Sequence, residues 1–160
     1  MLSNNMVLEI IKKYGYDRQN ILYILHELQE RDAQNYIREE YASLIEENMD
    51  IKLSEIYDIV TFHSMFHEKP NGKYIIEICN SGPCFVRKGK KIAECLEDLL
   101  GIKMGETTVD GMFTLKYTSC IGACDVAPAF KVGEKIYGNL TKEKVYKIID
   151  EIRGESTWRN

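Results

Sequence analysis

The sequence predicts an α+β protein in which an N-terminal helical bundle, residues 1–69, precedes an α/β domain, residues 70–160. Three observations support this fold class. Apolar residues before Pro70 recur with helical spacing, Pro70-Asn71-Gly72 is a turn signal, and strand-like runs alternate with helical ones after it. With 160 residues, 44% of them hydrophobic, the chain can form one domain or two small ones with real cores.

Four short amphipathic helices are expected before Pro70. Val7, Ile10, Ile11 and Tyr14 follow the i, i+3, i+4, i+7 spacing of the first. A polar break at 32–35 separates the second helix from the third, and Ser54 is the expected N-cap of the fourth. Such helices, joined by short breaks, form a small bundle. Their expected apolar faces are Ile21, Ile24, Leu25 and Leu28; Ile37, Tyr41, Leu44 and Ile45; and Ile56, Ile59, Val60 and Phe62.

The second half has the expected order β-α-β-β-α, with a crossover helix between the first two strands. This order is typical of a thioredoxin-like layer. Gly101 suits the left-handed C-cap of the crossover helix. The expected elements are a strand at Lys73–Ile78, a helix at Arg87–Leu100, one or two strands within Thr107–Thr118, a hairpin of Ala129–Val132 and Lys135–Tyr137, and a helix at Lys142–Arg153.

Four cysteines form two spaced pairs, Cys79-x4-Cys84 and, 35 residues later, Cys120-x3-Cys124. Each pair occupies a glycine-containing loop directly after a strand-like run. Two loops that each present two thiolates suit a [2Fe–2S] cluster, because each iron needs two terminal thiolates. The first loop also precedes a helix N-terminus, which favours thiolate over thiol. We therefore expect Cys79, Cys84, Cys120 and Cys124 to be the cluster ligands.

Disulfides, zinc and dithiol chemistry fit the cysteine pattern less well. The odd total of five and the absence of a basic-then-apolar leader argue against a secreted disulfide framework. Zinc is the most serious rival, but zinc ribbons favour C-x2-C spacing, and C-x-x-C dithiol motifs are absent. Cys95 falls in a helical run and is expected to be a core residue. His63 and His67 resemble a Rieske pair, although four cysteines already satisfy two irons.

Composition excludes several functions. The net charge of −4 gives no broad basic surface for nucleic acid, and the apolar runs are too short to span a bilayer. Free cysteines without a leader point to the cytoplasm. No glycine-rich phosphate loop or Rossmann fingerprint is present, so the chain is not expected to bind NADH itself. The basic residues at 87–91 have three possible interpretations: the solvated start of a helix, positive charge that offsets the negative charge of the iron–sulfur cluster, or a patch that binds an acidic partner.

Three stretches resemble a known family: Cys79–Cys84 with Val86–Gly89, Cys120–Cys124 with Ala127-Pro128, and Leu53–Phe62. The chain is similar to the thioredoxin-like [2Fe–2S] ferredoxin subunits of NADH-linked complexes. These include the E subunit of NADH:quinone oxidoreductase and the small subunits of NAD-linked or electron-bifurcating hydrogenases and formate dehydrogenases. The similarity covers roughly 17–153. His63 and Arg38 depart from the family's usual residues, which leaves the branch of the family open.

The resemblance implies an electron-transfer subunit of an NADH-dependent oxidoreductase complex, with no activity alone. FMN and NAD are then expected in a flavin-bearing partner subunit, beside further Fe–S subunits. Two alternatives stay open: a free-standing [2Fe–2S] ferredoxin or redox sensor, and a zinc-stabilised interaction module. The helical bundle favours the subunit, which can use it to grip a neighbour. The terminal acceptor and the role of the tail with Trp158, a frayed end or a docking anchor, are left open.

Overall fold

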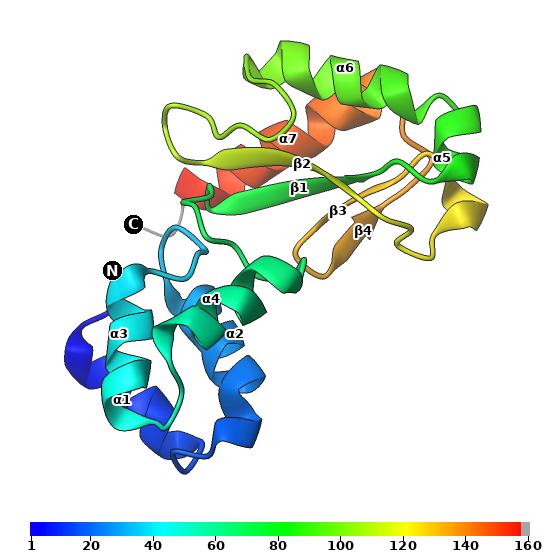
Figure 1. Cartoon of the computed structure of the whole chain (residues 1–160). Coiled ribbons are helices and arrows are strands. Elements are labelled where there is room, and N and C mark those ends of the chain that lie inside the picture. Colours follow the sequence, from blue (N-terminus) through cyan, green and yellow to red (C-terminus); the bar gives the residue numbers. More distant parts are fainter. Residues whose placement is uncertain (158–160) are drawn as a thin grey trace. The chain divides into compact units, whose positions relative to one another are not determined.

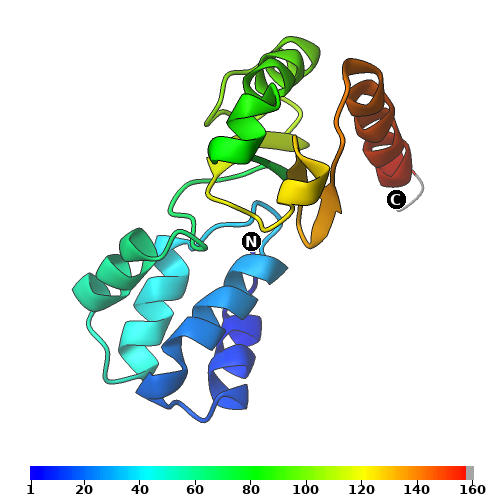
Figure 2. The same cartoon turned by 90° about the vertical axis from the view of Figure 1, so that its right-hand side faces the viewer.

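A computed structural model describes the backbone of residues 1–157 and the side chains of residues 1–154. The chain divides into two compact units, Met1–Lys73 and a second that begins at Tyr74, and each is described by itself (Figures 1 and 2). The tail with Trp158 lies outside the described residues. Within the described part, no helix has both the length and the apolar character that crossing a membrane requires.

The first unit contains the four expected helices. They are α1 (Asn4–Lys13), α2 (Ile21–Arg31), α3 (Glu39–Asn48) and α4 (Leu53–Phe62), with a 3₁₀ turn, η1 (Arg18–Asn20), leading into α2. Their apolar faces meet in one core, as the periodicity predicts. Ile37 is buried in that core, but it lies before the start of α3. Its backbone N–H donates to the carbonyl of His67 at 2.8 Å. Fully buried members include Val7, Ile11, Ile24, Leu25, Leu28 and Ile45.

Two expectations about α4 are wrong. Ser54 does not cap the helix, which begins one residue earlier; instead Glu46 Oε1 accepts the backbone N–H of Leu53 at 2.9 Å. Phe62 is 82% exposed rather than buried. The helix ends there and the chain continues in an extended conformation at His63, so Phe66 completes the apolar face instead, at 5% exposure.

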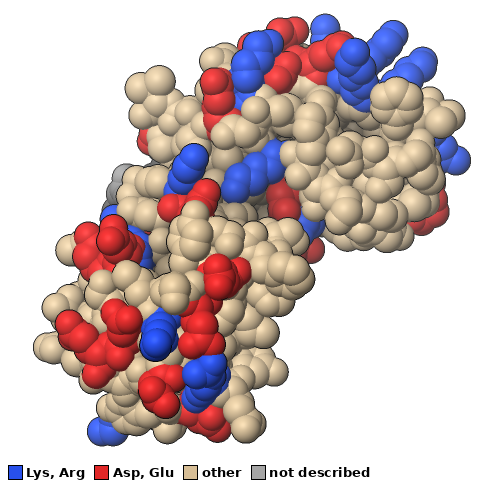
Figure 3. All heavy atoms as spheres, in the orientation of Figure 1, with Lys and Arg blue, Asp and Glu red and all other residues tan. Residues whose placement is uncertain are grey.

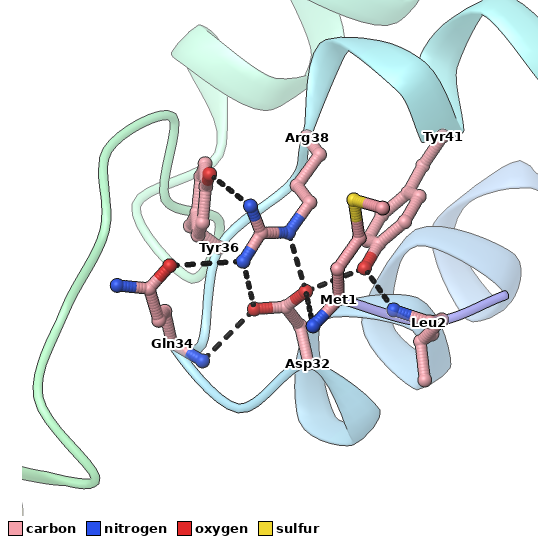
Figure 4. Close-up of polar contacts among 7 residues, drawn as sticks. All are labelled: Met1, Leu2, Asp32, Gln34, Tyr36, Arg38 and Tyr41. Atoms are coloured by element: carbon pink, nitrogen blue, oxygen red, sulfur yellow. Dashed lines mark hydrogen bonds and ion pairs between the residues drawn. The ribbon is translucent and has the colours of Figure 1, made fainter.

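A buried carboxylate organises the polar interior of the first unit (Figure 4). Asp32, whose side chain is fully buried, accepts hydrogen bonds from Arg38 Nε at 2.7 Å, the backbone N–H of Gln34 at 2.8 Å and the Tyr41 hydroxyl. That hydroxyl in turn accepts the backbone N–H of Leu2 at 2.7 Å. Burial raises the pKa of Asp32, but the hydrogen bonds from Arg38, Tyr41 and Gln34 together hold it below its ordinary value.

The second unit is a four-stranded mixed sheet with the order β2-β1-β3-β4. β1 (Tyr74–Cys79) pairs in parallel with β2 (Phe113–Thr118) and antiparallel with β3 (Phe130–Val132), which forms a hairpin with β4 (Lys135–Tyr137). The crossover helix α6 (Gly89–Leu100) and the last helix α7 (Lys142–Thr157) share one core with the sheet. This arrangement confirms the predicted α+β, thioredoxin-like fold (Figure 1).

The boundaries in the second unit differ in three places. A five-residue helix, α5 (Gly82–Val86), precedes the crossover helix, and Lys88 separates the two with a φ of 69°. Gly101 caps α6 with a φ of 68°, as expected. Only the second half of 107–118 forms a strand; Thr107 makes a single antiparallel bridge to Thr114. The last helix continues past its expected end.

Candidate metal centre

The two cysteine loops begin at neighbouring strand ends. Cys79 is the last residue of β1 and lies opposite Thr118, the last residue of β2, so the parallel pairing brings both exits to one edge of the sheet. The backbone N–H of Asn80 donates to the carbonyl of Thr118 at 3.2 Å, which ties the two exits together. Cys120 follows Thr118 by two residues. Strand topology thus places sequence segments 35 residues apart side by side.

The first loop buries its two thiols. Cys79 is 3% exposed and Cys84, within α5, is 2% exposed. Pro83 stands in the first turn of α5, where its missing N–H costs no helical hydrogen bond. The loop closes when the backbone N–H of Phe85 donates to the carbonyl of Ser81 at 2.9 Å. The result is a short helical turn that aims Cys84 back toward Cys79, and the two thiols hydrogen-bond to each other.

The second loop holds its thiols closer to solvent. Cys120 is exposed and Cys124 is half-buried, with their Sγ atoms 3.7 Å apart. Gly122 between them has a φ of 78°, a left-handed conformation that other residues rarely adopt. Cys124 opens a 3₁₀ turn, η2 (Cys124–Val126), and the chain then returns to β3. The tight turn at Gly122 is what lets two cysteines four positions apart approach each other.

Contacts between the loops join the two pairs. Ile121 packs against Cys79 and Cys84, and its backbone N–H donates to the Cys79 sulfur. Arg87, just after α5, donates from Nη1 to the carbonyl of Asp125 at 3.3 Å. The structure therefore gathers all four cysteines singled out in the sequence at one end of the sheet.

The environments of the thiols differ. Burial raises the pKa of Cys79, but hydrogen bonds from the Ser81 N–H, the Cys84 thiol and the Ile121 N–H hold it below the ordinary thiol value. Burial raises the pKa of Cys84, more than the Ala129 N–H lowers it. Cys79 is therefore the more readily ionised thiol of the buried pair.

The donor set suits a binuclear cluster. Within the part of the chain that the structure describes, no three His, Cys, Asp or Glu side chains are placed to hold one metal ion. A [2Fe–2S] cluster makes a different demand, because each iron takes two cysteines and the bridging sulfides supply its other ligands. One buried pair, and a second pair nearer to solvent on the adjoining loop, fit that demand.

Two glycines away from the cysteines hold the loops in place. A Cβ on Gly89 would lie 2.7 Å from the carbonyl oxygen of Cys84, and one on Gly138 would lie 2.3 Å from Cγ2 of Val126. Beyond Gly138, Leu140 donates its backbone N–H to the carbonyl of Pro128 at 3.2 Å. These two glycines were not identified from the sequence, because a glycine gives no sign in the sequence of the backbone or side chain that it contacts in the fold.

Cys95, His63 and His67, the other metal-ligand candidates of the sequence, have surroundings of their own. Cys95 is 2% exposed in the core of α6, where burial raises the pKa of its thiol. His63 and His67 belong to the first unit. The ring of His63 contacts Phe66 edge-on, with centroids 6.1 Å apart, and the backbone N–H of His67 donates to Gln29 Oε1 at 2.8 Å.

A thioredoxin-like sheet with two cysteines on each of two adjoining loops defines a class of small iron–sulfur proteins. Sequence comparison agrees: the chain belongs to the thioredoxin-like [2Fe-2S] ferredoxin family, whose model matches residues 7–153. Membership implies a [2Fe–2S] cluster as the cofactor and confirms the predicted resemblance.

Curated relatives are parts of larger enzymes. The chain is 32% identical over 145 residues to NADP-reducing hydrogenase subunit HndA of Solidesulfovibrio fructosivorans, covering 91% of this chain and 84% of that protein. It is 34% identical over 148 residues to the E subunit of the NADH-quinone oxidoreductase of Rickettsia felis, covering 92% and 89%. A crystal structure of NAD+-reducing [NiFe]-hydrogenase in the air-oxidized state matches with a TM-score of 0.75 at 18% identity. The match covers 85% of this chain but 23% of that one, and it shows the fold alone.

Proposed function

We propose that this chain is the one-electron carrier of a multisubunit NADH-dependent oxidoreductase, and that it exchanges electrons with a flavin-bearing partner subunit. Cys79, Cys84, Cys120 and Cys124 are the proposed ligands of its cluster. The observation that carries the proposal is the meeting of two cysteine pairs at adjoining strand ends. The names of the relatives, subunits of a hydrogenase and of a quinone oxidoreductase, support the assignment to such a complex.

The chemistry divides between this chain and its partner. When bound, the cluster supplies one-electron redox chemistry. The chain's own residues hold the sulfurs, with backbone N–H groups of Ser81 and Ile121 directed at Cys79, and keep the second loop open to a partner. A nicotinamide releases two electrons as a hydride, so a flavin in the partner separates them into single steps. The isolated chain is therefore inactive toward NADH.

Anaerobic purification followed by EPR tests the proposal. The loaded chain is expected to be red-brown and to contain about two irons and two acid-labile sulfides. NADH should reduce its cluster only after the flavoprotein is added. Reduction by NADH in the isolated chain would overturn the subunit assignment, and stoichiometric zinc without visible absorption would overturn the cluster.

We propose that the helical bundle binds a neighbouring subunit, a contact that a free-standing ferredoxin does not need. Large side chains of α4 or just after it are exposed, among them Phe62 at 82% and Met65 at 54%. A groove of about 640 Å³ lies beside α4, and its lining includes the apolar residues Ala42, Leu53 and Val60. Phe62→Ser should weaken co-purification with the complex while leaving the visible spectrum unchanged. Retention as tight as that of the parent chain would overturn the role proposed for the bundle and leave the subunit assignment standing.

A further inference from the structure

We propose that the surface formed by α5 and the first turn of α6 is a docking site for an acidic face of the subunit that exchanges electrons with this chain. We call it the basic rim; its residues are Phe85, Val86, Lys88, Lys90 and Lys91. The proposal rests on the proposed function only for the identity of the partner. The charge and exposure of the rim beside the cysteine centre are features of this chain alone.

The apolar part of the rim adjoins a proposed ligand. In α5 only Cys84 is buried, while the next two residues, Phe85 and Val86, are 64% and 81% exposed. A short helix that turns its cysteine inward and its aromatic ring outward presents an apolar surface right beside the redox centre. Exposed apolar groups rimmed by polar ones mark interaction sites. They offer a partner a dry contact next to the sulfurs.

The polar part of the rim is uniformly basic. No Asp or Glu occurs between Gly82 and Lys91, although the whole chain has a net charge of −4. Within the described residues, Lys88 and Lys91 make no ion pair, and Lys90 has only an exposed one with Glu94 at 3.9 Å. Figure 3 shows Lys and Arg side chains gathered over α5 and the adjoining end of α6. These charges remain available to a partner.

Helix stability does not account for these lysines. Lys90 and Lys91 occupy the first turn of α6, where the helix dipole favours acidic side chains and opposes basic ones. Nor do they serve mainly to offset the cluster's negative charge, because solvent screens exposed charges. An acidic partner changes this balance: it displaces water from the contact, and the attraction strengthens in the lower dielectric. Docking to an acidic partner therefore explains why two lysines occupy a helix turn where the dipole disfavours them.

Two small redox probes of opposite charge test the rim without any partner. The reduced chain passes one electron from its cluster to each ferricyanide anion or to each hexaamminecobalt(III) cation, and stopped-flow absorbance follows the bleached cluster's recovery. At an ionic strength of ~10 mM, Lys90→Glu/Lys91→Glu should slow the ferricyanide reaction by about tenfold and accelerate the cobalt reaction, and both effects should shrink at ~0.5 M salt. Glutamate suits the first turn of a helix, so the variant is expected to fold.

Lys103→Glu/Lys147→Glu is the matched control. It changes the net charge by the same amount at two exposed lysines outside the rim. Unchanged rates for the rim variant with both probes, or equal effects from the control, would overturn the proposal.

Binding of the flavoprotein tests which partner occupies the basic rim. The rim variant and Phe85→Gln should each weaken its binding to the chain, measured by calorimetry at low salt, by about tenfold. Only the charge variant should alter the ferricyanide rate, because Phe85 carries no charge. Unchanged flavoprotein affinity in both variants would overturn the partner assignment. So would a parent chain that binds phosphatidylglycerol vesicles and loses that binding in the variants while its flavoprotein affinity is unchanged. If the flavoprotein fails to bind even the parent chain, the proposed function fails, and the small probes still report on the rim.

Discussion

Each unit contains a buried polar centre, and the two centres are completed in different ways. In the first unit Asp32 is surrounded by donors from its own chain, among them Arg38 and Tyr41. In the second unit Cys79 and Cys84 are buried without a charged partner side chain among their hydrogen bonds, which come from thiols, backbone N–H groups and the Ser81 hydroxyl, and Cys84 has a raised pKa. A buried polar group without full compensation destabilises a fold. We therefore expect the bundle to be complete without a cofactor and the cysteine loops to depend on one.

Charge separates the two units as well. Residues 1–73 contain eight Lys or Arg and 13 Asp or Glu, a net charge of −5, while residues 74–160 contain 13 and 12, a net charge of +1. The acidic unit holds no cysteine, and the more basic unit holds all five. The unit that contains the proposed cluster ligands is therefore also the less acidic of the two.

The largest expected effect comes from removing a buried ligand. Cys84→Ala should abolish cluster binding, because one iron loses one of its two thiolate ligands. Iron and sulfide content and the visible spectrum measure this loss. The bundle should keep its helical circular dichroism and its unfolding transition. Melting of the bundle together with the cluster would contradict the proposed independence of the two centres.

The converse change acts on the bundle. Asp32→Asn should destabilise the first unit by about 3 kcal/mol, since it leaves Arg38 without its carboxylate partner. Urea unfolding measures the change. The cluster content of the folded protein should stay that of the parent.

The same carboxylate predicts an acid limit for the bundle. The folded-state pKa of Asp32 lies below its unfolded value, so its contribution to stability is present above the unfolded pKa of about 4 and is lost as pH falls through the folded value. The midpoint of urea unfolding should therefore drop in this acid range for the parent chain and much less for Asp32→Asn. Parallel pH profiles would show that Asp32 is not the responsible group.

A smaller effect is expected at the support of the second cysteine loop. Gly138→Ala places a methyl group 2.3 Å from Val126 Cγ2, and the overpacking should cost about 1–3 kcal/mol. Release of iron to a chelator should be faster. Gly154→Ala is the control, because a Cβ there meets nothing within 4 Å. Equal chelation rates in both variants would show that this contact does not hold the loop.

The smallest effect is expected at Cys95. Cys95→Ala should retain the full cluster and lower the stability of the second unit by about 1 kcal/mol, through a small cavity in the core beside α6. Iron content and thermal unfolding measure the two quantities. Loss of the cluster from this change alone would show that the proposed ligand set is wrong.

The sequence predicts what repeats or pairs locally. Helical periodicity predicted the four helices of the bundle. The spacing of the cysteines identified both cysteine loops, and the structure shows that the sheet brings these loops together. Features that depend on distant partners were missed. α5 is too short to show a period, Phe62 follows the helical pattern but lies where the helix ends, and Gly138 is explained only by Val126 twelve residues earlier.

The tie between Gly138 and the second cysteine loop sets an order of events during biosynthesis. Val126 receives the backbone N–H of Asn139 on its carbonyl, and Leu140 donates to Pro128, so residues translated after both cysteine pairs fasten the loop that carries Cys120 and Cys124. We therefore expect the loop that carries Cys120 and Cys124 to reach its final conformation only after residues 138–140 have been synthesised.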